Sequence, residues 1–100
     1  MSKTELIVAA QCAVSPPNLK IVTSTGIKTA TRANVGEYVL ELKEEHHTNH
    51  WIPTATLLGG AAGQISVLPL NKEHVQINTF DASGVAADSS FAIQILRHDD

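Results

Sequence analysis

The segment Glu44-Glu45-His46-His47-Thr48-Asn49-His50, here called the histidine loop, holds the densest group of side chains that could do chemistry. Three imidazoles and two carboxylates within seven residues could bind zinc, nickel or iron. Their spacing matches no mononuclear metal motif, and Thr48-Asn49 disfavours the helix that would place His47 and His50 on one face. We therefore interpret the segment as a solvated loop and expect no cofactor. In a symmetric trimer, one such loop per subunit could still complete a shared metal site near the axis.

Trp51 follows the histidine loop and precedes Pro53, which makes it the candidate for a sugar-stacking platform. A tryptophan in such a setting is more often an anchor of the core or of an interface. The candidate binding residues are thus Trp51, His46, His47 and His50, and the last three are also the metal candidates.

The chain contains no motif of a known catalytic or nucleotide-binding site, neither Gly-x-Ser-x-Gly nor a phosphate-binding glycine loop. The single cysteine, Cys12, lies in an apolar run and is expected to be a buried thiol rather than a nucleophile. Asp81 and Asp88 flank the last loop and could coordinate calcium, but an Asx turn and a cap at the start of a strand are commoner roles. We therefore expect no enzyme.

Composition indicates one soluble globular domain, residues 1–100, with a formal net charge of −3. The seven basic residues are scattered, whereas a nucleic-acid binder needs a basic stripe that neutralises phosphates. Glu5 interrupts the apolar region that a signal peptide would need, so we expect synthesis in the cytoplasm without one. Prolines and glycines break the uncharged run of residues 51–71, so no membrane insertion is expected.

The elements that must position these residues are strands, because apolar residues alternate with polar ones at period two along most of the chain. Turn residues separate eight such segments. The predicted strands are Glu5–Val14, Leu19–Ser24, Ile27–Asn34, Glu37–Lys43, Trp51–Leu58, Gln64–Leu70, His74–Phe80 and Phe91–Arg97. A helical turn at Lys43–His47 is compatible with the sequence. The pattern predicts an all-β protein: an antiparallel, jelly-roll-like β-sandwich.

Three segments carry a resemblance to a known family: Gly36-Glu-Tyr-Val-Leu-Glu-Leu42, Val75-Gln-Ile-Asn-Thr-Phe80 and Phe91-Ala-Ile-Gln-Ile95. They resemble a central strand and the closing strands of trimeric jelly rolls of the complement-globular-head and tumour-necrosis-factor kind. More narrowly, the chain is similar to the knob domains that end phage tail fibres and needles. The resemblance implies a homotrimer that belongs to a virion and contacts a host surface receptor or glycan.

The expected function is therefore that of a non-enzymatic structural or host-attachment module of a phage virion or fibre, acting as a homotrimer. One alternative is a monomeric β-sandwich that binds a carbohydrate through Trp51 and neighbouring loops. Another is a small metal-binding protein that uses the loop from His46 to His50. The mass in solution separates the homotrimeric module from the monomeric carbohydrate binder. Metal analysis tests the metal-binding alternative.

Overall fold

The computed structural model describes residues 3–46, 50–59 and 62–99, and within this part the chain forms eight β-strands and no α-helix. The strands are β1 (Lys3–Ser15), β2 (Asn18–Thr25), β3 (Ile27–Asn34), β4 (Glu37–Leu42), β5 (Trp51–Leu57), β6 (Gly63–Asn71), β7 (His74–Asp81) and β8 (Phe91–Asp99). Every predicted strand is present, with both ends within two residues of their predicted positions. No helix of the described residues is long and apolar enough to cross a membrane.

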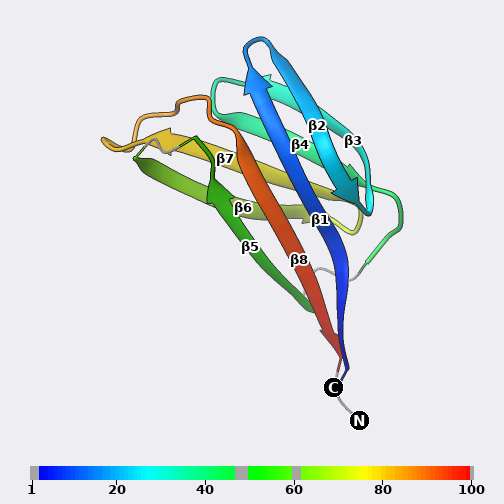
Figure 1. The fold of residues 1–100 in the computed structure, drawn as a ribbon. Helices are drawn as coiled ribbons and strands as arrows, with labels where there is room; N and C mark the ends of the chain where they lie inside the picture. Colours follow the sequence, from blue (N-terminus) through cyan, green and yellow to red (C-terminus); the bar gives the residue numbers. More distant parts are fainter. Residues whose placement is uncertain (1–2, 47–49, 60–61, 100) are drawn as a thin grey trace.

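Two antiparallel sheets of four strands lie against each other and confirm the predicted sandwich (Figure 1). The strand order is β2-β1-β8-β5 in the first sheet, called sheet A here, and β3-β4-β7-β6 in the second, sheet B. As in a jelly roll, the first and last strands are neighbours. Three of the six strand pairs, however, are hairpins between consecutive strands: β1 with β2, β3 with β4, and β6 with β7. Because β1 and β8 are antiparallel, the start of β1 lies beside the end of β8 (Figure 1).

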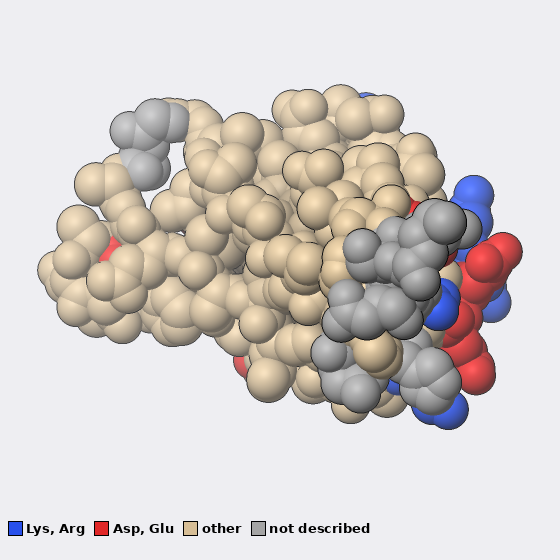
Figure 2. All heavy atoms as spheres, turned by 90° about the horizontal axis from the view of Figure 1, so that it is seen from below, with Lys and Arg blue, Asp and Glu red and all other residues tan. Residues whose placement is uncertain are grey.

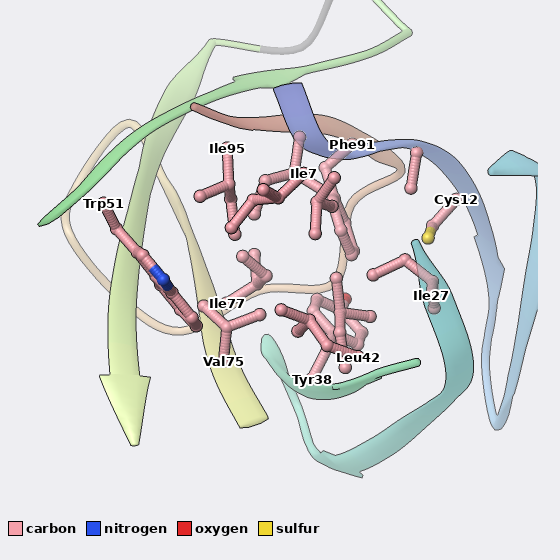
Figure 3. Packing of buried hydrophobic residues seen from close by; sticks show 14 residues of the cluster. Ile7, Cys12, Ile27, Tyr38, Leu42, Trp51, Val75, Ile77, Phe91 and Ile95 are labelled. Atoms are coloured by element: carbon pink, nitrogen blue, oxygen red, sulfur yellow. The ribbon is translucent and has the colours of Figure 1, made fainter. Parts of the chain in front are cut away.

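The core fills the space between the sheets with side chains from alternate positions of each strand (Figure 3). Along β4, Tyr38, Leu40 and Leu42 are buried, while the residues between them are partly exposed. The Tyr38 ring meets Phe91 of sheet A with the ring centroids 5.1 Å apart and the planes tilted by 34°. Aromatic rings prefer such offset or tilted contacts, so this pair joins the two sheets within the core.

All four edge strands carry features that hinder further strand pairing. Edge strands β5 and β6 each contain a proline, Pro53 and Pro69, which has no N–H to donate to a neighbour. Edge strand β2 skips Val22 in its register with β1, and edge strand β3 has two register shifts against β4. Bulges of this kind bend an edge away from a second strand. The sheets therefore need no neighbouring subunit to cover their edges.

Candidate binding face

The histidine loop does not form a metal site within the described residues. The backbone N–H of His46 donates to the carbonyl of Lys72 at 2.8 Å, which ties the loop to the turn between β6 and β7. His50 is exposed, and its Nδ1 lies 3.1 Å from the carbonyl oxygen of His98 on β8. His47 lies outside the described residues. No group of three or more potential metal ligands occurs in the part of the chain that the structure describes.

The helical turn that the sequence allowed at Lys43–His47 is absent from its described part. Residues 43–46 form bends and irregular backbone. The N–H groups here bond to other turns instead of to the preceding helical turn: that of Lys43 donates to the carbonyl of Gly26 at 2.9 Å. Tertiary hydrogen bonds therefore decide the conformation of this segment.

Trp51, the candidate sugar platform, faces the core (Figure 3). Only 8 % of the residue is exposed, so its ring offers no open face for a sugar in this structure. Its indole N–H is buried and makes no hydrogen bond. The structure thus gives Trp51 the core-anchor role that the sequence also allowed.

Asp88 lies in the loop between β7 and β8 and accepts four hydrogen bonds. Arg32 on β3 donates two of them, from Nε at 3.0 Å and from Nη2 at 2.8 Å. The backbone N–H of Gly36 and the hydroxyl of Tyr38 donate the other two, at 2.9 and 2.8 Å. Tyr38 in turn accepts a bond from the N–H of Ser89 at 3.2 Å. We call this arrangement the Asp88 clamp, because it fastens the last loop to sheet B.

The electrostatics of the clamp are those of a structural ion pair. Hydrogen bonds from Arg32, together with those from Gly36 and Tyr38, hold the pKa of the Asp88 carboxyl well below its usual range. Burial is the main cause that raises the pKa of Tyr38. With its oxygens occupied by four donors, the carboxylate is not placed to act as a base or as a calcium ligand.

Asp81 forms the expected Asx turn, since its Oδ1 accepts from the N–H groups of Ser83 and Val85.

The central part of the outer face of sheet A, between the row of Thr4 and His98 and the row of Ala13 and Lys20, carries no charged side chain. Its side chains alternate with core residues and form three rows across the strands. The rows are Leu6, Leu96 and Ile52; then Thr25, Ala9, Gln94 and Thr54; and then Thr23, Gln11, Ala92 and Thr56. None of these eleven side chains is ionisable at neutral pH. We call this surface the neutral face.

The neutral face is hollowed where its alanines lie. A shallow groove of about 520 Å³ crosses all four strands, and its floor includes Ala9 and Ala92. Threonine hydroxyls and the amides of Gln11 and Gln94 line its sides. Beside the groove, the apolar row projects from the sheet, with Leu6 47 % and Ile52 49 % exposed. Hydroxyl, amide and apolar groups can bind a partner, but none of the lining residues is an acid, a base or an activated nucleophile.

Charged side chains gather elsewhere, towards one end of the molecule (Figure 2). This is the end at which the turns between β2 and β3, β4 and β5, and β6 and β7 meet, because successive strands run in opposite directions. Among the charged residues there are Lys43, Glu44, Glu45, Lys72 and Glu73. The opposite end of the same view shows almost no charge. A partner that approaches the neutral face therefore meets no dense charge.

Comparison with protein-family models, with curated proteins and with solved structures finds no match to this chain. The fold and the geometry of its surfaces are therefore the basis for assigning a function. Sequence reasoning did not find the neutral face or the Asp88 clamp. The visible signal for the face was the pair of alternating segments Thr23-Ser-Thr25 and Thr54-Ala-Thr56, whose threonines share one side of their strands.

Proposed function

We propose that this protein is a non-enzymatic structural or attachment module that acts as a homo-oligomer and binds through the neutral face. The observation that carries the proposal is the composition of that face: eleven outward side chains from four strands, all uncharged, with an exposed apolar row beside a shallow groove. Exposed apolar side chains in a contiguous row are typical of surfaces that a partner covers. A role in a phage virion or fibre, as a homotrimer, follows from the sequence resemblance.

The chemistry of the groove favours binding over catalysis. Catalysis of acyl, phosphoryl or glycosyl transfer needs a general acid or base, an activated nucleophile or a metal held at the reacting bond. The groove offers Thr and Ser hydroxyls and Gln amides, with no base among the lining residues to activate them. Such groups donate and accept hydrogen bonds and so orient a neutral partner.

A self-associating module also fits the charge of the chain. With a net charge of −3, two copies repel each other only weakly at long range. The neutral face lets two copies meet without burying an unpaired charge, which is a costly step in protein association.

Sedimentation equilibrium of tag-free protein at several concentrations tests this proposal. We expect a mass above the 10.7 kDa of the single chain, and three times that mass for the homotrimer. A strictly monomeric protein up to millimolar concentration would contradict the proposal. Turnover of a substrate that is lost on substitution of a residue in the groove would contradict its non-enzymatic part.

A further inference from the structure

The groove in the neutral face is lined by hydrogen-bonding groups that the protein itself does not use. Six polar side chains of the neutral face line it, and none of them makes a hydrogen bond within the part of the chain that the structure describes. They are the amides of Gln11 and Gln94 and the hydroxyls of Thr23, Thr25, Thr54 and Thr56. Because hydroxyls and carboxamides both donate and accept, the groove offers a ligand six sites of each kind of bond.

The outer side of sheet B differs in this respect. The amide of Gln76, on the central strand β7, donates to Oδ1 of Asn78 at 2.9 Å. The hydroxyl of Thr29 on β3 donates to Oε1 of Glu41 on β4 at 3.1 Å. Polar side chains on sheet B therefore pair with one another. Those around the groove do not, although they lie in the same kind of sheet.

The positions of the threonines define the extent of the groove. Thr23 and Thr25 on β2 mark one end, and Thr54 and Thr56 on β5 mark the other. Since β2 and β5 are three strand spacings apart, the two ends are separated by about 14 Å. Within each pair, the two threonines are about 7 Å apart along the strand. The groove is therefore longer than a single sugar ring or amino acid.

The lining disfavours three kinds of ligand. An ionic ligand would leave water without meeting a charged side chain, because no lining residue is charged. An apolar ligand would bury the six polar groups without partners. Extended peptides bind by adding a strand to the edge of a sheet or in a groove lined by aromatic rings. This groove crosses the face of a sheet and has no aromatic lining.

We propose that the groove binds a neutral oligosaccharide. Sugar hydroxyls donate and accept, as the side chains around the groove do, and the methyl groups of Ala9 and Ala92 on the floor suit the C–H side of a sugar ring. This inference rests on the proposed function in using the neutral face for attachment, and it adds the class of the ligand. The row Leu6-Leu96-Ile52 lies outside the groove, so a bound saccharide leaves this row for contact between copies.

The lining also sets the strength of binding. Four of the six polar side chains are threonines, whose branched Cβ restricts χ1, so little side-chain freedom is lost when a ligand binds. No aromatic ring is present to stack on the sugar, and this limits the apolar contact. We therefore expect a Kd in the millimolar range for one groove. A homo-oligomer that presents several grooves to a repetitive surface would attach more tightly.

Titration of the isotope-labelled full chain, followed by amide chemical shifts, tests the class of the ligand. The neutral probes are cellotriose, maltotriose and triacetylchitotriose, the charged probe is trigalacturonic acid, and the peptide probe is trialanine with blocked ends. We expect at least one neutral trisaccharide to shift the amide signals of Ala9, Ala92 and Gln94 with a millimolar Kd. The charged trisaccharide should bind at least about tenfold more weakly, because its carboxylates meet no cation in the groove.

A matched pair of glutamines locates the site. Gln94 and Gln76 both lie on the outer side of a central strand, Gln94 on β8 of sheet A and Gln76 on β7 of sheet B. Gln94→Leu removes a carboxamide from the groove and should weaken saccharide binding about fivefold, the effect of one hydrogen bond. Gln76→Leu should leave binding unchanged. Thermal melting confirms that both variants fold.

A matched pair of alanines tests the shape of the site. Ala9 and Ala13 lie on the same side of β1, but only Ala9 lines the groove. Ala9→Leu fills the floor and should weaken saccharide binding at least about tenfold, since the ligand loses its contact with the sheet. Ala13→Leu adds the same side chain outside the groove and should have no effect.

The outcomes separate this inference from the proposed function. No shift with any neutral trisaccharide at tens of millimolar, or binding that Gln94→Leu and Ala9→Leu leave unchanged, would refute the inference. Tighter binding of the charged trisaccharide or of the blocked peptide would overturn it in favour of that other ligand class. An oligomer in sedimentation that binds no saccharide would leave the proposed function in place. A monomer that binds a saccharide in the groove would keep this inference and remove the homo-oligomer.

Discussion

Replacing Asp88 by alanine removes the acceptor of four hydrogen bonds and leaves Arg32 without its carboxylate partner. Removing one member of a buried ion pair typically costs about 3–5 kcal/mol. The side chains of Arg32 and Asp88 retain 18 % and 14 % exposure, so water can replace part of what is lost. We therefore expect Asp88→Ala to lower the free energy of unfolding by about 3 kcal/mol, at the low end of that range.

This loss is large for a chain of 100 residues, whose total stability is expected to be about 5–15 kcal/mol. At roughly 4–8 °C per kcal/mol for a domain of this size, the melting temperature should fall by about 12–24 °C. Urea unfolding followed by circular dichroism or tryptophan fluorescence measures the difference directly. Asp88→Asn keeps an oxygen for Gly36 and Tyr38 but loses the charge, so its cost should be about half as large.

Asp81→Ala is the matched control, because Asp81 begins the same loop and accepts two backbone N–H bonds at an exposed site. Water can satisfy those donors, so we expect a loss of only about 1 kcal/mol. Equal losses in the free energy of unfolding for Asp88→Ala and Asp81→Ala would show that the two carboxylates contribute equally to stability. A loss below about 1 kcal/mol for Asp88→Ala would refute the reasoning, since that is the value of an ordinary hydrogen bond.

The clamp also predicts the response of the protein to acid. Its hydrogen bonds, those from Arg32 first, lower the pKa of Asp88 in the folded state. The unfolded chain then takes up this proton at a higher pH than the folded chain does. The stability that the charged Asp88 carboxylate gives the folded state is therefore complete above the ordinary carboxyl pKa of about 3.9 and is lost as pH falls below it. The stability difference between parent and Asp88→Ala should therefore shrink from pH 7 towards pH 2. A difference that is constant over this range would contradict the pKa assignment.

Three further outcomes follow from single positions. Burial raises the pKa of the Cys12 thiol to about 11, so Cys12 should resist thiol reagents at pH 8 and react only in denaturant; rapid labelling of the native protein would contradict this. Gly36→Ala should destabilise the protein by at least about 2 kcal/mol in urea unfolding, because φ is 66° and the added Cβ would collide with the carbonyl oxygen of Thr79. Gly84→Ala should cost only about 1 kcal/mol, because φ is 83° but the added Cβ would meet open space; equal losses at the two glycines would show that the collision is unimportant.

The strands could be predicted from the sequence because each one is buried on one side only. Along β4 and β7, alternate residues enter the core, and this alternation is visible without any knowledge of the partner strand. The Asx turn at Asp81 was equally accessible, since its cause lies within five residues. Local physical causes leave local signals in the sequence.

The clamp and the neutral face depend on contacts between distant parts of the chain. Arg32 and Asp88 are 56 positions apart, and nothing near either residue indicates the other. The neutral face requires the register of β1, β2, β5 and β8, because only the register places the threonines of the two edge strands beside the alanines of the central ones. A single sequence without aligned relatives does not specify the register of nonconsecutive strands.

The edges and the faces of this sandwich differ in what they allow a second copy to do. Prolines in β5 and β6 and register shifts in β2 and β3 hinder the addition of another strand, and this protects a small all-β protein from edge-to-edge aggregation. The turns at one end carry charged side chains of both signs, and contact there would remove them from water. The outer face of sheet A carries neither obstacle. For the association of copies that we propose, this leaves a face, where side chains rather than backbone hydrogen bonds would determine the fit.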